Sequence, residues 1–179
     1  MGLRRRVPTG LTRGADLLPA AVRARDGEAI VDLWARYVAS LSREPMTLLH
    51  GDAHIGNTYV LPDGTVGFLD WQVAHRGGWS QDVGYFLVAA LTVEDRREHE
   101  NGLIEEYLAA LEVPARDRPS TEEARLRYRA SAAYGLAIWL STLGTDGWQR
   151  PEVCLALAER YAAAFVELET VPALARLGV

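Results

Sequence analysis

Hydrophobic residues are spaced mainly as in α-helices along this chain. Between residues 26 and 42 they recur every three or four positions, which places them on one face of a helix. These positions are Ile30, Leu33, Trp34, Tyr37, Val38 and Leu41. We expect a helix from Asp26 to Ser42, ended by Pro45.

Capping sequences predict where the later helices begin. Ser80 is expected to cap the first of them, and Thr92 and Ser120 each open a capping box, in which the first side chain accepts a backbone N–H three residues on. Gly144 and Pro151 suit a helix end and a helix start. The expected helices cover residues 81–91, from 93 to before Pro114, 121–143, and a last long helix from 151.

One short β-hairpin interrupts this helical pattern. Residues 58–61 and 66–69 are runs of strand-forming residues, and Pro62-Asp63-Gly64-Thr65 between them is a turn sequence. The hairpin joins a polar, glycine-broken loop at residues 50–57 to Asp70-Trp71, so strand pairing would bring these two polar sites together. The fold class predicted is α+β, mainly α.

Length and composition favour one domain. With 179 residues the chain can bury a hydrophobic core. We interpret the arginine-rich residues 1–25 as a solvated N-terminal tail or linker, and residues 26–179 as the folded domain.

Charge and hydropathy exclude several classes of partner. A formal net charge of -5 gives no electrostatic footprint for nucleic acid. The longest apolar run, at about residues 85–93, is far shorter than the roughly 20 residues of a membrane-spanning helix. Cys154 is the only cysteine and cannot form an internal disulfide. We therefore expect a cytoplasmic protein with a small-molecule partner and with no nucleic-acid or membrane partner.

The chemistry concentrates in residues 50–57, His-Gly-Asp-Ala-His-Ile-Gly-Asn. This octet fits H-x-D-x-x-x-x-N, the catalytic-loop pattern of protein kinases. Phosphoryl transfer needs a carboxylate that accepts the hydroxyl proton and hard oxygen ligands for Mg²⁺. Asp52 suits the first role, and the Asn57 amide oxygen and the Asp70 carboxylate suit the second.

Four features follow one another in a fixed order: the octet, the hairpin, the segment Phe68-Leu69-Asp70-Trp71, and Asp82. In this order the sequence resembles the aminoglycoside phosphotransferase and choline kinase superfamily, from about Leu48 to Leu87. The resemblance implies the C-terminal lobe of a protein-kinase-like fold. It implies that Asp52 is the catalytic base, that Asn57 and Asp70 hold the Mg²⁺ of bound ATP, and that His50 and Asp82 fix the catalytic loop. In having Gln72 directly after Asp70-Trp71, the sequence resembles the ecdysteroid-kinase-like branch of the superfamily more than the antibiotic-modifying enzymes.

The N-terminal lobe that binds the nucleotide in that family is not visible in the sequence. All 19 basic residues are arginine, so the family's ATP-binding lysine is missing, and no glycine-rich loop precedes the octet. Arginine is a poor substitute, because its planar fork differs from a compact ammonium. We expect a C-terminal lobe only, with an N-terminal lobe from a longer form, a separate chain or a homo-oligomer. The C-terminal lobe by itself should have negligible kinase activity.

Two other functions are kept as alternatives. The first is a non-catalytic kinase lobe that binds a partner. The second is a metallohydrolase in which His50, Asp52 and His54 bind zinc. His54 fits a packed or amide-bonded histidine better than a catalytic one, and the acidic residues around 94–100 are expected to face water.

Overall fold

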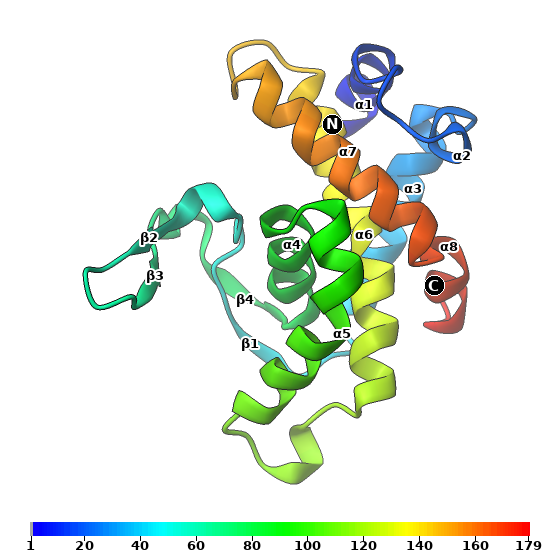
Figure 1. The fold of residues 1–179 in the computed structure, drawn as a ribbon. Helices are drawn as coiled ribbons and strands as arrows, with labels where there is room; N and C mark the ends of the chain where they lie inside the picture. The colour runs from blue at the N-terminus through cyan, green and yellow to red at the C-terminus, as the bar shows by residue number, and fades with distance from the viewer. Residues whose placement is uncertain (1) are drawn as a thin grey trace.

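A computed structural model describes residues 2–179 and is mainly helical (Figure 1). The helices are α1 (Gly2–Arg13), α2 (Ala20–Arg23), α3 (Gly27–Leu41), α4 (Ser80–Ala90), α5 (Val93–Ala110), α6 (Thr121–Leu143), α7 (Pro151–Glu167) and α8 (Thr170–Arg176). Short 3-10 turns are η1 (Ile55–Asn57), η2 (Trp71–Val73) and η3 (Ala115–Asp117). No helix within residues 2–179 combines the length and apolarity that crossing a bilayer demands.

Helix α6 is the centre of the helical body. It contacts α1, α3, α4, α5, α7 and α8. Its buried positions are largely small, which lets these neighbours approach closely: Ala124, Ala130, Ala132, Ala133, Gly135 and Ala137. The larger apolar side chains of the surrounding helices fill the remaining space, and together they form one hydrophobic core.

Most helix predictions are confirmed. Thr92 caps α5 and Ser120 caps α6, each by accepting a backbone N–H three residues later. Asp26, expected as the start of the helix, caps α3 by accepting the backbone N–H of Ala29, a cap that was not predicted. Pro151 begins α7 as expected. Helices α1, α2 and α8 were not predicted.

The expected cap of α4 is wrong. Ser80 is the first residue of α4, and Trp79 precedes it without a side-chain cap. The backbone N–H and the hydroxyl of Ser80 instead donate to the carboxylate of Glu44, at 3.0 and 2.6 Å. The group that caps α4 therefore comes from a segment far away in the sequence.

The prediction of a solvated tail over residues 1–25 is also wrong for the residues described. Val7 in α1 and Val22 in α2 are fully buried. Gly10 lies so close to the backbone of Leu140 in α6 that a Cβ atom would clash there. The arginines misled the prediction because Arg4 lies on the outer face of α1, where it pairs with acidic side chains of α3.

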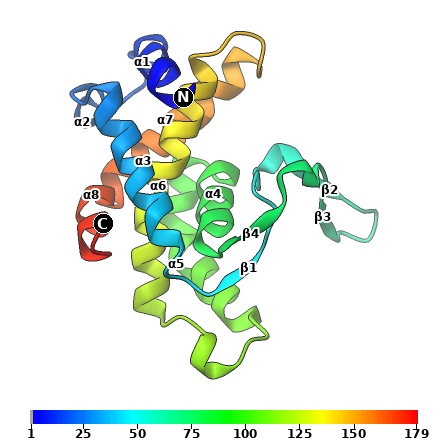
Figure 2. The same cartoon turned by 180° about the vertical axis from the view of Figure 1, so that it is seen from behind.

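Two small antiparallel sheets lie beside the helices, where one hairpin was predicted. The predicted hairpin is β2 (Thr58–Val60) with β3 (Val66–Phe68), and it projects away from the helical body in both views (Figures 1 and 2). The second sheet pairs β1 (Met46–Leu49) with β4 (His75–Gly78). Because β1 ends just before the polar octet and β4 begins just after η2, this sheet closes the base of the loop and hairpin.

Candidate active site

The polar octet begins where β1 ends, and a carboxylate of α4 holds it there. Asp82 accepts the backbone N–H of His50 at 2.6 Å and that of Gly51 at 3.1 Å. Burial raises the pKa of the Asp82 carboxyl above its usual value, while these two hydrogen bonds act in the opposite direction. Gly51 has φ +85°, and a Cβ atom there would lie 2.5 Å from the carbonyl oxygen of Val73. The turn therefore requires glycine next to Asp52.

His50 connects the octet to the strand that precedes Asp70. Its ring is buried and packs against Trp71, with ring centroids 4.7 Å apart. Nε2 lies 2.8 Å from the Leu69 carbonyl oxygen, and Nδ1 accepts the Asp52 backbone N–H at 3.3 Å. Because a carbonyl oxygen can only accept, Nε2 carries the proton. Both ring nitrogens of His50 are thus engaged in positioning the loop.

Asn57 fixes the conformation of the octet from its other end. Its buried side chain donates from Nδ2 to the Asp52 carbonyl oxygen at 2.9 Å and to Asp52 Oδ2 at 3.4 Å. These acceptors determine which side of the amide bears nitrogen. The amide oxygen Oδ1 has no hydrogen-bond donor among residues 2–179 and so is available to a cation.

Asp70 lies beside Asn57 because the hairpin pairing continues past β3. The backbone N–H of Leu69 donates to the Asn57 carbonyl oxygen at 2.9 Å, which places the next residue, Asp70, near the end of the octet. Asp70 has left-handed backbone angles, φ 62° and ψ 57°, at the start of η2. Such a conformation costs about 1 kcal/mol or more for a residue other than glycine and is common at functional sites. Among residues 2–179 the exposed carboxylate has one weak donor, Gln72 Nε2 at 3.5 Å from Oδ2.

Asp52 itself is accessible. Its side chain is 44% exposed, and Oδ2 is the oxygen that faces Asn57 and His54. The structure therefore brings together all five residues expected from the sequence: His50, Asp52, Asn57, Asp70 and Asp82. Their catalytic and metal-binding roles stay predictions.

The oxygen donors of this site fit Mg²⁺. An amide oxygen and a carboxylate, Asn57 Oδ1 and Asp70, are hard ligands, and Mg²⁺ binds through one or two such groups together with phosphates and water. Zinc fits poorly, because His50 uses both ring nitrogens internally. Within residues 2–179 there is also no cluster of three or more His, Cys, Asp or Glu side chains suited to a metal ion.

Sequence reasoning missed Glu44, which positions α4 and hence Asp82. Its side chain is fully buried and binds Ser80 and Arg127. No local pattern marks it, because its partners are contributed by α4 and α6.

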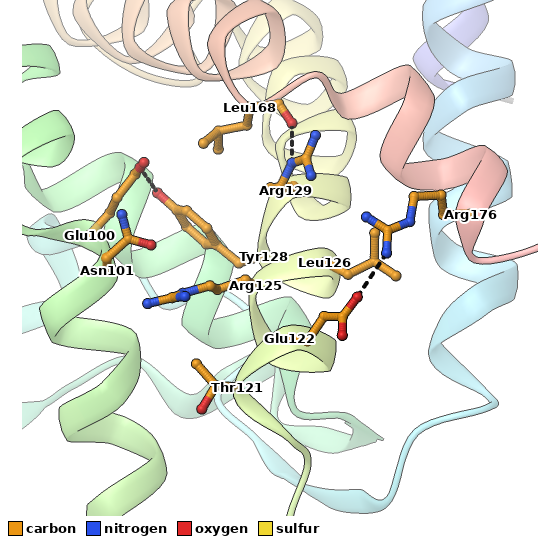
Figure 3. A pocket seen from close by; sticks show the side chains of 10 residues that line it. All are labelled: Glu100, Asn101, Thr121, Glu122, Arg125, Leu126, Tyr128, Arg129, Leu168 and Arg176. Atoms are coloured by element: carbon orange, nitrogen blue, oxygen red, sulfur yellow. Dashed lines mark hydrogen bonds and ion pairs between the residues drawn. The ribbon is translucent and has the colours of Figure 1, made fainter.

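Among the hollows of the surface, two bear on phosphate or substrate binding. One, of about 390 Å³, borders His50 and Asp82 and has aromatic walls that include Phe86 and Tyr107. The other, of about 320 Å³, lies between α5, α6 and α8 (Figure 3). Its three arginines are each paired with a glutamate: Arg125 with Glu105, Arg129 with Glu169, and Arg176 with Glu122. These pairings neutralise the second hollow, so it offers little attraction to a phosphate group.

Comparison with known proteins agrees with this geometry. None of the curated proteins matches the chain. The model of the phosphotransferase enzyme family, APH, matches residues 5–124, from α1 through the octet, the hairpin and α4 to the start of α6. Because this match spans more than half of the chain and includes the whole candidate site, the chain belongs to the phosphotransferase enzyme family.

Proposed function

We propose that the chain is the catalytic lobe of a phosphotransferase that moves the γ-phosphoryl group of ATP to a hydroxyl of a small molecule. One observation carries the proposal: Asp52, Asn57 and Asp70 lie on a single loop and hairpin whose base is anchored by buried groups. A cytoplasmic location is part of the proposal, supported by the free, buried thiol of Cys154.

In this proposal each polar side chain has a separate task. Asp52 orients the acceptor hydroxyl and receives its proton, on the oxygen that does not face Asn57. Asn57 and Asp70 hold Mg²⁺, which when bound neutralises charge on the β- and γ-phosphates. His50 and Asp82 keep the octet in place, and such positioning supplies a large share of the rate in phosphoryl transfer.

The same proposal requires a second, nucleotide-clamping lobe, whether on the same polypeptide or on another. The hairpin and η1 expose apolar side chains on the projecting side of the molecule: Ile55 (50% exposed), Tyr59, Val60 (68%), Leu61 and Val66 (59%). A cluster of exposed apolar side chains is typical of a surface that a partner or ligand covers. We propose that the adenine base and the second lobe cover it.

Paramagnetic Mn²⁺ tests the nucleotide site directly. With Mn²⁺-ATP added to the isotopically labelled protein, amide resonances of residues 56–58 and 69–71 should broaden before others. Asp70→Asn should weaken this broadening. Asp16→Asn, a matched change at an exposed aspartate outside the site, should leave it unchanged.

Phosphoryl transfer is then measured with [γ-³²P]ATP, Mg²⁺ and a panel of small hydroxyl compounds, or water as acceptor. We expect slow transfer by the lobe alone and faster transfer when a nucleotide-clamping lobe is supplied. Broadening spread over the whole surface, or transfer that does not depend on Asp52, would reject the proposal.

A further inference from the structure

His54 lies in the middle of the octet, and its ring is held in one orientation. Nδ1 accepts the backbone N–H of Gly56 at 3.0 Å, so the side chain caps η1. The ring meets Trp139 of α6 edge-on, with centroids 5.8 Å apart and an interplanar angle of 83°. Its side chain is only 15% exposed. The remaining nitrogen, Nε2, faces Asp52 Oδ2 at 3.8 Å.

The cap determines where the neutral ring carries its proton. A backbone N–H must meet a lone pair, so Nδ1 is unprotonated and Nε2 bears the hydrogen. His54 therefore presents a donor to Asp52. The 3.8 Å separation exceeds a direct hydrogen bond, and catalytic hydrogen bonds commonly shorten only when substrate binds.

We propose that His54 is a positioning residue for Asp52. Its Nε2–H and the Asn57 amide together hold Oδ2 of Asp52, which leaves Oδ1 directed to the acceptor hydroxyl. This inference rests on the proposed function, in which Asp52 is the base. It gives His54 a second task beyond its cap.

Two substitutions separate the cap from the positioning role. Asparagine is a good capping residue and keeps an acceptor near the place of Nδ1, but it has no group at the place of Nε2. Glutamine reaches the place of Nε2 with a donor but does not reproduce the short cap. His54→Asn thus removes the contact with Asp52, whereas His54→Gln removes the cap.

The first test is spectroscopic and needs no turnover. In long-range ¹H–¹⁵N spectra of the ¹⁵N-histidine-labelled protein at about pH 8, His54, assigned with His54→Asn, should be protonated at Nε2. Asp52→Asn should shift this Nε2 resonance and leave that of His99, exposed on α5, in place. A proton on Nδ1, or identical His54 resonances with and without the Asp52 charge, would overturn the inference.

The second test measures Mg²⁺-dependent ATP turnover with water as acceptor and with a nucleotide-clamping lobe supplied. His54→Asn should lower kcat about 10- to 100-fold, the usual effect of losing such a supporting contact, with KM for ATP changed less than about threefold. His54→Gln should restore much of kcat. The reverse order, an active His54→Asn and an impaired His54→Gln, would mean that His54 is only a cap. If the unsubstituted protein showed no turnover even with a nucleotide-clamping lobe supplied, while the His54–Asp52 coupling was observed, the positioning would stand and the phosphotransferase assignment would fail.

Discussion

The buried carboxylate of Glu44 connects three helices, and we expect Glu44→Gln to be strongly destabilising. Glu44 follows α3, accepts both hydrogen bonds from Ser80 at the start of α4, and pairs with Arg127 of α6 at 2.9 Å. Glutamine has nearly the same shape. The substitution therefore removes the charge while leaving the space filled.

The magnitude follows from what Arg127 loses. Its side chain is 8% exposed, and removing one partner of a buried ion pair typically costs 3–5 kcal/mol. Glu123, itself 43% exposed, remains 2.9 Å from Arg127 Nε and compensates part of the charge. Glutamine can still accept one hydrogen bond from Ser80. We therefore expect a loss of about 3 kcal/mol, a sizeable part of the 5–15 kcal/mol typical of a domain.

Urea denaturation followed by circular dichroism measures this loss. Arg127→Met in the Glu44→Gln background removes the unpaired charge, so the double variant should lose less than the sum of the two single variants. Glu94→Gln is the exposed control and should change the free energy of unfolding by less than about 0.5 kcal/mol. A loss below about 1 kcal/mol for Glu44→Gln, or additive effects in the double variant, would refute the reasoning.

Three further predictions address the site and its support. Asp52→Ala should lower kcat about 10²- to 10⁴-fold and change the Kd for ATP less than about threefold, and unchanged turnover would remove Asp52 from the role of base. Hydrogen bonding and ion pairing with Arg97 lower the pKa of Glu167, so this carboxylate stabilises the fold above its unfolded pKa and the contribution is lost as pH falls through the folded pKa. Glu167→Gln should then cost about 1 kcal/mol at neutral pH and little near pH 3 in urea titrations, whereas a pH-independent cost would contradict this sign. Gly51→Ala should cost about 2 kcal/mol or more in thermal unfolding, because φ +85° and the Val73 carbonyl oxygen oppose a Cβ atom, and a neutral result would mean that the turn can rearrange.

Local patterns predicted the parts of the fold that local interactions determine. The caps at Thr92 and Ser120 join a side chain to an N–H three residues away, so the local sequence contains both partners. The β2–β3 hairpin is determined in the same way by the turn at residues 62–65. The pairing of this hairpin also places Asn57 near Asp70, as their positions on either side of the predicted hairpin indicated.

Tertiary contacts decided what the patterns missed. Val7 is buried because α6 presents a small-residue surface more than a hundred residues later, and nothing near Val7 signals this. Glu100 was expected to face water, yet its side chain is 14% exposed and pairs with the buried Arg96. A charged residue among other charged residues is predicted from sequence to face solvent, because the distant partner that buries it is not visible there.

The site separates anchoring from chemistry, and this division should be visible in the variants. His50 and Asp82 spend their hydrogen bonds on the protein, and they are buried and half-buried. Asn57 belongs to both groups, because its Nδ2 holds Asp52 while its Oδ1 stays available to a cation. Asp52 and Asp70 keep carboxylate oxygens exposed, although the strained backbone at Asp70 needs that support. Substitutions at the anchors should therefore lower stability and activity together, because they release the loop. Substitutions at the two exposed carboxylates should lower activity with little loss of stability, since no folded contact depends strongly on their charge.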